Sequence, residues 1–276
     1  MEWDVLGTTE IRASSLPSYM DCSRRAASKA VADEIRDAGY DLTKLPPSAG
    51  AALGTASHAA SEFLMQRKMD TGELGPVEDG IEHAVEKFGL EIADGVVWDD
   101  ATPNRNTALI QLERQVRAYV PVMETFTPLA LEMSLKADVG DGFVLSGHMD
   151  ILTTAGDIRD EKYGALSRPY QSQLGAYSLL ARSNGYQVTG LKIDWVQRVG
   201  KTKVQPPCQT FDYDVGESEV AAHGIIARVK QDTQAFRADP DGLWRAWPAN
   251  PMSLMCSDKY CPAYGTNFCD AWKYRH

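Results

Sequence analysis

The sequence predicts an α/β (α+β) protein in which a mixed β-sheet is flanked by helices. Apolar residues recur at helical spacing through the first 126 residues, and from residue 129 the period changes to the alternation typical of strands. A helical pattern then returns once between strands and once after them. Helices followed by a β-meander with an inserted helix, and then by a further helix, do not have the alternating order of a doubly wound sheet.

Caps and breakers set the expected helix boundaries in the first half. We expect residues 1–14 to be irregular. Ser15-Leu16-Pro17 then has the features of a helix start, because a hydroxyl side chain can cap a helix and proline fits its first turn. Pro46-Pro47-Ser48 and Pro103 interrupt the pattern further on. The expected helices are 16–38, 50–69, 76–92 and 106–126.

The second half begins with strands. Residues 129–137 alternate between apolar and polar, and in the next strand His148 and Asp150 share the face opposite Met149. Gly200-Lys201 is the expected turn between the last two strands. The expected strands are 129–137, 143–151, 158–162, 188–199 and 202–213, and the expected helices are 168–183 and 216–238.

Composition and charge exclude several classes of protein. The chain has 276 residues, 43% hydrophobic and 24% charged, as in an ordinary soluble protein with a sizeable core. Its apolar runs are too short for a membrane span, and Met1–Val5 lacks the basic start of a secretory leader. The formal net charge of −10 excludes a protein that coats nucleic acid through overall positive charge. Any contact with nucleic acid must therefore be local.

The densest chemistry lies on two neighbouring strands. On an extended strand Asp160 and Lys162 project together and Glu161 projects oppositely, while Asp150 on the adjacent strand can approach Asp160. Two carboxylates held together are unfavourable unless a cation lies between them, and such oxygen ligands suit Mg²⁺ or Mn²⁺. A nearby ammonium could position a water for attack on a phosphate, or help to deprotonate it. By itself, an Asp-x-Lys tripeptide is more often a solvated strand face.

The wider context resembles the PD-(D/E)xK nuclease superfamily, in its RecB-like and Cas4-like exonuclease branch. In that branch a Gly-x-x-Asp strand is followed by Asp-x-Lys and then by a Gln-x-x-x-Tyr helix. Here these elements are Gly147–Asp150, Asp160–Lys162 and Gln173–Tyr177. An upstream Gly-Thr-x-x-His pattern matches Gly54–His58. The resemblance implies a restriction-endonuclease-like core.

The same resemblance implies roles for individual residues. The implied metal ligands are His58, Asp150, Asp160 and the carbonyl of Glu161, holding Mg²⁺ or Mn²⁺. The implied catalytic residues are Asp150, Asp160, Lys162, Gln173 and Tyr177. Lys162 would orient the attacking water, and Gln173 and Tyr177 would contact the nucleic-acid strand or brace the site. Glu132, on the polar face of the preceding strand, is a weaker candidate and is equally readable as a solvated carboxylate.

The five cysteines form a second pattern. An odd number argues against a disulfide framework, and Cys208 is read as a spare thiol. Three cysteines clustered in the tail and one remote cysteine fit chance, a zinc site or an iron–sulfur cluster. Cas4-like nucleases carry one N-terminal and three C-terminal cysteines on a [4Fe–4S] cluster, and Tyr19–Arg25 is similar to their Tyr-x-x-Cys-Pro-Arg segment, with Ser23 replacing proline. The resemblance thus implies a structural [4Fe–4S] cluster, with Zn²⁺ as the alternative, on Cys22, Cys256, Cys261 and Cys269.

These features together predict one nuclease domain over residues 1–276. Its parts are a mainly helical segment 1–126, a catalytic sheet with the Gln-x-x-x-Tyr helix 127–215, and a helix and cluster-binding tail 216–276. The expected activity is that of a cytoplasmic, prokaryotic or phage-encoded, metal-dependent DNA exonuclease acting on single strands or ends. The alternative is a non-catalytic DNA- or protein-binding module of a CRISPR adaptation or recombination complex, and homo-oligomerisation stays open. The basic groups available for local phosphate contacts, each of which is individually more often an ordinary surface charge, are Arg24, Arg25, Lys29, Lys192, Arg198, Lys201 and Lys203.

Overall fold

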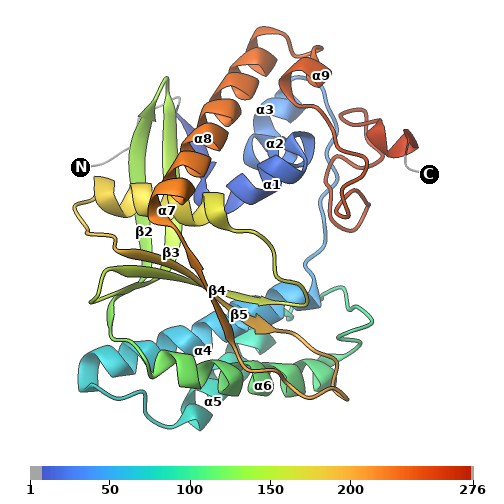
Figure 1. Ribbon diagram of the computed structural model, residues 1–276. Helices are drawn as coiled ribbons and strands as arrows, with labels where there is room; N and C mark the ends of the chain where they lie inside the picture. Colours follow the sequence, from blue (N-terminus) through green and yellow to red (C-terminus); the bar gives the residue numbers. More distant parts are fainter. Residues whose placement is uncertain (1–7, 275–276) are drawn as a thin grey trace.

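A mixed six-stranded sheet lies at the centre of the molecule, with helices on both of its faces (Figure 1). The computed structural model describes residues 8–274, so the first residues, where we expected no secretory leader, lie outside the described part. The predicted fold class is confirmed. The strands are β1 (Thr9–Arg12), β2 (Pro128–Gly140), β3 (Phe143–Thr153), β4 (Asp157–Gly164), β5 (Gly190–Gln197) and β6 (Gln209–Tyr213).

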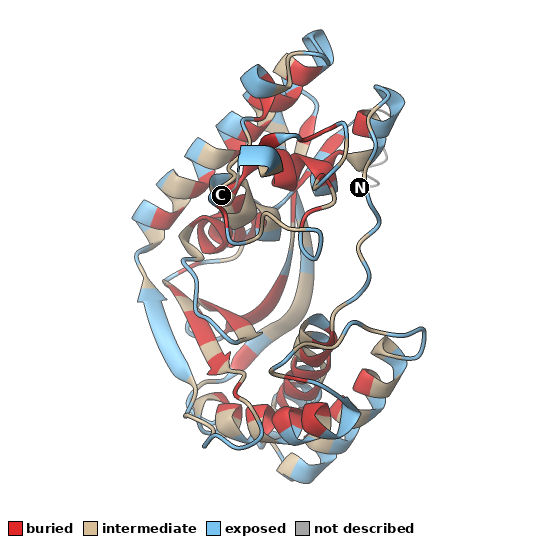
Figure 2. Cartoon of the chain, turned by 90° about the vertical axis from the view of Figure 1, so that its right-hand side faces the viewer, coloured by how far each residue is buried: buried red, intermediate tan, exposed pale blue. Residues whose placement is uncertain are grey.

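The pairing around β3 sets up the candidate site. β2 runs antiparallel to β3 along its length, so β1 and β4 must share the other edge of β3. β1 pairs in parallel with residues 143–146, and β4 pairs antiparallel with residues 151–152. Between these stretches, residues 147–150 have no partner on this edge among the described strands. The sheet continues through β5, parallel to β4, to the exposed edge strand β6 (Figure 2).

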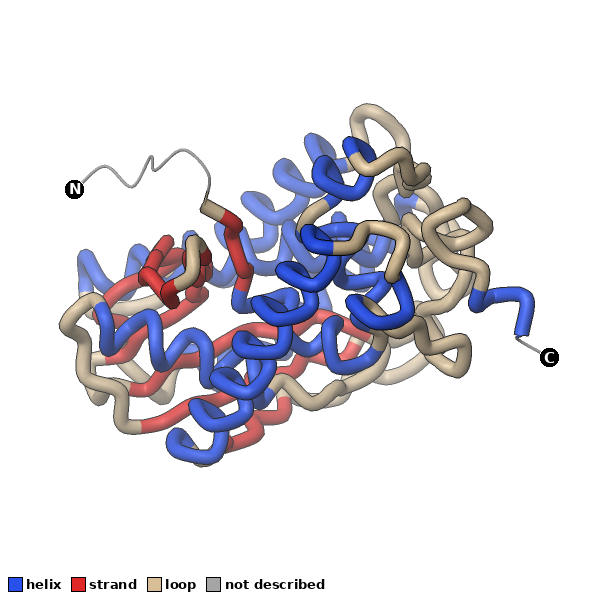
Figure 3. The backbone as a smooth tube through the Cα atoms, turned by 90° about the horizontal axis from the view of Figure 1, so that it is seen from above, coloured by secondary structure: helices blue, strands red, loops and turns tan. Residues whose placement is uncertain are grey.

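Helices cover the sheet in two layers with separate cores. One core joins the sheet to α7, α8 and α1, and the other joins it to α4, α5 and α6. A third core, around Trp247 and Phe268, packs α2, α3 and the end of α8 against the tail, most of which is loop (Figure 3). The helices are α1 (Leu16–Asp21), α2 (Ser23–Ala30), α3 (Ala32–Asp37), α4 (Ala49–Thr71), α5 (Val77–Glu91), α6 (Arg105–Met123), α7 (Gln171–Ser183), α8 (Val215–Ala238) and α9 (Leu243–Ala246), with 3-10 turns η1 (Ala13–Ser15) and η2 (Ala271–Tyr274).

Three expectations about local structure are wrong. Residues 9–12 are not irregular, because Ile11 enters the first core and the backbone pairs with β3. The expected helix 16–38 breaks into three at Cys22, whose φ and ψ of −156° and 104° are extended, and at Val31. The expected strand 202–213 begins only at residue 209, since Pro206-Pro207 has no N–H groups to donate to a ladder.

No helix among residues 8–274 is both long enough and apolar enough to cross a lipid bilayer. The sequence had excluded a membrane span for the same reason.

Candidate active site

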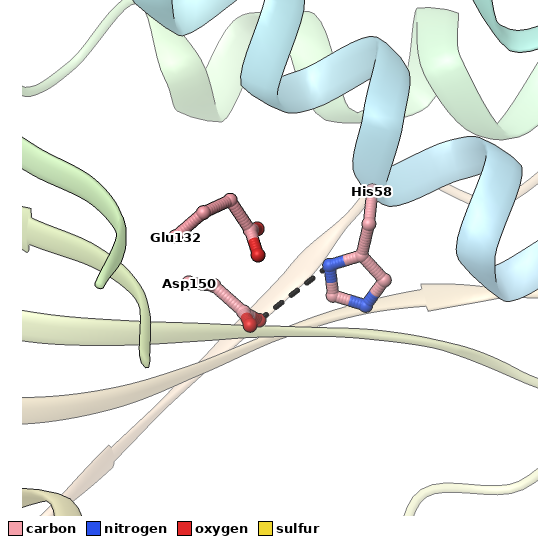
Figure 4. A group of neighbouring side chains, drawn as sticks. All are labelled: His58, Glu132 and Asp150. Atoms are coloured by element: carbon pink, nitrogen blue, oxygen red, sulfur yellow. Dashed lines mark ion pairs between the residues drawn. The ribbon is translucent and has the colours of Figure 1, made fainter. Parts of the chain in front are cut away.

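Helix α4 brings His58 to the sheet because its buried face is made of small residues. Ala52, Ala56 and Ala60 are almost fully buried, so the helix axis can lie close to the strands. The hydroxyl of Ser48 accepts a hydrogen bond of 3.2 Å from the amide N–H of Ala51 and so caps the first turn of α4. The side chain of His58 projects from α4 towards β3 (Figure 4).

Three potential metal ligands converge in front of β3. His58, Glu132 and Asp150 each offer a ligand atom, and these atoms lie within 4.8 Å of one another. Figure 4 shows the three side chains, from α4, β2 and β3, pointing towards a common centre. Among residues 8–274 no other group of three or more His, Cys, Asp and Glu side chains meets this criterion. His58 Nδ1 lies 3.6 Å from Asp150 Oδ2 and 3.9 Å from Glu161 Oε2.

Glu132 reaches this group through a distortion of β2. It lies opposite Asp150, between the pairs Leu131–Ile151 and Met133–Met149, and its φ of 47° is left-handed. For a residue other than glycine such a φ costs about 1–2 kcal/mol, and strained residues of this kind are enriched at active sites and ligand-binding sites. The Glu132 carboxylate forms a hydrogen bond of 2.5 Å with His148 Nε2. The Ser134 hydroxyl forms a second one, of 2.8 Å, with His148 Nδ1.

The electrostatics of this group suit a cation. Burial, with a further contribution from Lys162, lowers the pKa of His58 to about 4, so its imidazole is neutral near pH 7 and able to bind metal. Burial, and then the neighbouring Asp150, raises the pKa of Glu132 to about 7. Burial also raises the pKa of Asp150. Two neighbouring carboxyl groups are difficult to ionise at the same time because their negative charges repel. A divalent cation between them stabilises the ionised form of both.

Asp160 and Lys162 lie side by side next to this group and project to the same face of β4, where they form an ion pair. Gln173 Nε2 of α7 donates to Asp160 Oδ1 and to the Tyr177 hydroxyl, both at 3.0 Å. Burial raises the pKa of Asp160 to about 6. Burial opposes the charge on Lys162, but Asp160 and Asp150 outweigh it and raise its pKa.

The side chain of Glu161 points the opposite way, towards α4. It accepts hydrogen bonds from the hydroxyls of Ser61 and, at 2.8 Å, Tyr163. The Glu161 amide donates to Asp150 Oδ2 at 2.7 Å, which satisfies this N–H where β3 and β4 separate. Burial raises the pKa of the Glu161 carboxyl well above its usual value.

The structure therefore groups the candidate residues in two adjoining sets. His58 and Asp150 meet together with Glu132, the candidate that sequence reasoning had placed lower, whereas Asp160 is engaged by Lys162 and Gln173. Sequence reasoning gave no role to His148, although it had placed this residue on the same strand face as Asp150.

The four cysteines assigned to the cluster line one cavity. Cys22, Cys256, Cys261 and Cys269 line it together with Arg24 and Arg25. Burial, and to a smaller degree the other three cysteines, raises the pKa of Cys261 to about 11. The remaining thiol, Cys208, packs instead against the core formed with α4–α6.

Two features of this cavity fit a large anionic group bound through thiolates. Among the described residues, Arg24 Nη2 and Arg25 Nε are buried without a hydrogen-bond partner. A tetrahedral zinc with Zn–S bonds of about 2.3 Å would bring its sulfurs within about 3.8 Å of one another. Among the described residues no three of the cysteine sulfurs lie within 4.8 Å of one another, so they are not grouped as tightly as one tetrahedral zinc requires.

The fold and the site define an α/β protein of restriction-endonuclease-like architecture with a candidate divalent-metal centre on its sheet. A candidate exonuclease from Eubacterium rectale has a similar structure, with a TM-score of 0.50 and 11% identity over 79% of this chain and 77% of that chain. An alkaline exonuclease from Laribacter hongkongensis aligns with a TM-score of 0.31 and 10% identity, over 67% of this chain and 98% of that one. Its complex with dAMP gives a TM-score of 0.30 and 11% identity, over 68% and 93%.

Of these similarities, the first reaches a TM-score of 0.5, and at 11% identity it establishes the fold alone. No family model and no curated protein matches the chain.

Proposed function

We propose that this protein is a divalent-metal-dependent deoxyribonuclease that hydrolyses phosphodiester bonds, acting as an exonuclease on single strands or DNA ends. The observation that carries the proposal is the convergence of His58, Glu132 and Asp150 beside the Asp160–Lys162 pair. A neutral imidazole and two carboxylates form a donor set for Mn²⁺ or Mg²⁺. A bound ion would supply Lewis-acid polarisation of the phosphate and a water of lowered pKa.

The protein's own contribution centres on Lys162. Its raised pKa keeps it an ammonium at neutral pH, so in this state it donates hydrogen bonds and does not accept a proton. Beside the candidate metal centre it orients water and stabilises the negative charge that develops on the phosphate. Asp160 holds the ammonium, and Gln173 fixes Asp160 from α7.

The exonucleolytic mode is the part that depends on resemblance. The motifs match those of RecB-like and Cas4-like exonucleases, and the Eubacterium rectale protein with a similar fold is itself described as a candidate exonuclease. Both favour an enzyme acting on free ends.

We further propose that the cysteine cavity holds a structural [4Fe–4S] cluster. Its support is the shared cavity, the spacing of the sulfurs and the two unpartnered guanidinium nitrogens. The cluster would tie Cys22, at the start of α2, to the tail and so couple its binding to folding. Protein purified without oxygen should be brown and carry about four irons and four sulfides per chain. A colourless protein with one zinc per chain would show that the proposal of an iron–sulfur cluster is wrong.

The nuclease is tested on end-labelled linear single-stranded, linear double-stranded and circular DNA, with Mn²⁺ and with EDTA. We expect metal-dependent loss of linear DNA, shortened from an end, with circles intact. Asp150→Asn should abolish cleavage while leaving the circular dichroism spectrum unchanged. Cleavage that persists in EDTA or in the Asp150 variant would refute the metal centre. DNA binding without cleavage under any divalent ion would instead favour the non-catalytic module.

A further inference from the structure

The strand face that carries the candidate metal centre continues beyond it as a polar groove. The groove has a volume of about 550 Å³ and begins at His148, two residues before Asp150 on the same face of β3. Its lining includes Arg12, Ser134, Lys136, Ser146, His148 and Asn184. This volume lies outside the group of metal ligands, and nothing in the proposed chemistry at Asp150 uses it.

Strand register places two cations side by side in this groove. Ser146 of β3 is paired with Arg12 of β1 on one edge and with Lys136 of β2 on the other. Ile11 and Leu145, the residues before Arg12 and Ser146, are buried in the first core, so the row of three points to the opposite, open face. With strands about 4.8 Å apart, the Cα atoms of Arg12 and Lys136 are about 10 Å apart.

The rows are ordered along β3 from the metal centre outwards. Glu132 and Asp150 form the first row, Ser134 and His148 the second, and the two cations flank Ser146 in the third. Asp150 and Ser146 are four positions apart in the strand, which is about 13 Å. At the rise of about 3.4 Å per nucleotide of one strand in B-DNA, this distance corresponds to about four nucleotides.

The charges of the rows favour an anionic polymer of limited length on this face. Arg12 is an accessible cation, since its side chain is 73% exposed and its ion pair with Glu10 is 3.7 Å long. The fourth row presents Glu10 and Asp138 on the two sides of Val144 and would repel phosphate. The cations therefore stand between the metal centre and an acidic boundary.

We propose that this groove binds the sugar–phosphate backbone of the DNA strand that enters the active site, with Arg12 and Lys136 contacting phosphates about four nucleotides from the scissile bond. Ser146 lines the same space, and its hydroxyl can donate to a phosphate oxygen. The identity of the strand as substrate rests on the proposed nuclease function, but its binding does not require cleavage.

The test is binding of fluorescein-labelled oligothymidylate, measured by anisotropy in EDTA so that no cleavage occurs. Arg12→Ser and Lys136→Ser should each weaken binding of a ten-nucleotide strand about five- to tenfold at low salt, through loss of a charge-assisted contact. Each should also reduce the slope of log K against log salt by about 0.7, and the double variant by about 1.4. Binding of a dinucleotide should not change, because it does not reach the third row.

Arg245→Ser is the matched control. Arg245 is similarly exposed (82%) and similarly weakly paired, 3.8 Å from Asp239, but lies in α9. The Arg245→Ser substitution should leave both the affinity for the oligonucleotide and the salt slope unchanged. Glu10→Gln, which removes a negative charge from the fourth row, should tighten binding.

The possible results separate the two proposals. If the double variant of Arg12 and Lys136 has wild-type affinity and salt slope, the proposal that the groove binds DNA is wrong, even if the enzyme cleaves DNA. Salt-dependent binding that is lost in the double variant supports the groove even if no divalent ion supports cleavage, in which case the nuclease proposal alone fails.

Discussion

Replacing Lys162 with methionine removes one charge from the candidate active site and nearly preserves the length of the side chain. Lys162 pairs with Asp160, whose carboxylate is fully buried. If the ammonium stabilises charge that develops on the phosphate, its loss should lower kcat about 100- to 1000-fold, equivalent to about 2.7–4 kcal/mol. KM should change little, because the interaction is made mainly in the transition state.

The same substitution has a pH-dependent effect on stability. The pKa of Asp160 is already raised by burial from 3.8 to about 6, and it rises further once its cation is gone. A folded-state carboxyl with a raised pKa binds more protons than the unfolded chain, so stability falls as pH rises through the interval between the two values. In the variant this interval extends above pH 6. The loss relative to wild type should be small near pH 5 and reach about 1–3 kcal/mol near pH 8.

Lys230→Met is the matched control for this experiment. The Lys230 side chain is 16% exposed against 22% for Lys162, and it pairs with Asp141 at 2.6 Å, away from the candidate site. Single-turnover cleavage with Mn²⁺ and urea unfolding at pH 5 and pH 8 give the two readouts. The assigned role is refuted if the folded Lys162 variant cleaves within threefold of wild type, or if the Lys230 variant loses as much activity.

Three further substitutions test other parts of the structure. A Cβ at Gly147 would come within 2.7–3.0 Å of side chains on α7, so Gly147→Val should lower the free energy of unfolding in urea by about 1–3 kcal/mol and reduce cleavage, whereas Gly89→Ala, with open space around it, should do neither. Burial raises the pKa of Glu132 from 4.5 to about 7, so between these values the folded protein binds a proton that the unfolded chain does not. The melting temperature in EDTA should therefore fall as pH rises from about 5 to 7.5. Glu132→Gln should make this dependence on pH weaker, and an unchanged dependence would contradict the raised pKa of Glu132. Cys22→Ser should lower iron content and melting temperature, and equal losses in Cys208→Ser would count against the assigned ligands.

Features set by local periodicity could be predicted from the sequence. The shared face of Asp160 and Lys162 follows from the two-residue period of a strand, and the contact between Gln173 and Tyr177 follows from their spacing of four on a helix. Long helices were placed closely as well, such as α8 at 215–238 against an expected 216–238.

Features that depend on pairing between segments far apart in the chain could not be predicted from the sequence. β1 is a strand only because residues 143–146, more than 130 positions later, provide its ladder. The left-handed φ of Glu132 has no signal in its neighbours and occurs in β2 opposite Asp150. Arg12 and Lys136 were not among the expected phosphate contacts for the same reason, since the register of three strands brings them together.

The position of Arg12 also links the groove to the cysteine cavity. β1 has only four residues, and ten positions after Arg12 the chain reaches Cys22 through η1 and α1. The candidate metal ligands, in contrast, come from α4, β2 and β3, and none of them lies in the tail. If both proposals hold, loss of the proposed cluster should weaken oligonucleotide binding through Arg12 more than it weakens Mn²⁺ binding. Cys22→Ser measured in the presence and absence of Arg12→Ser decides this, because the two losses of affinity should be less than additive, and full additivity would show that the cluster acts elsewhere.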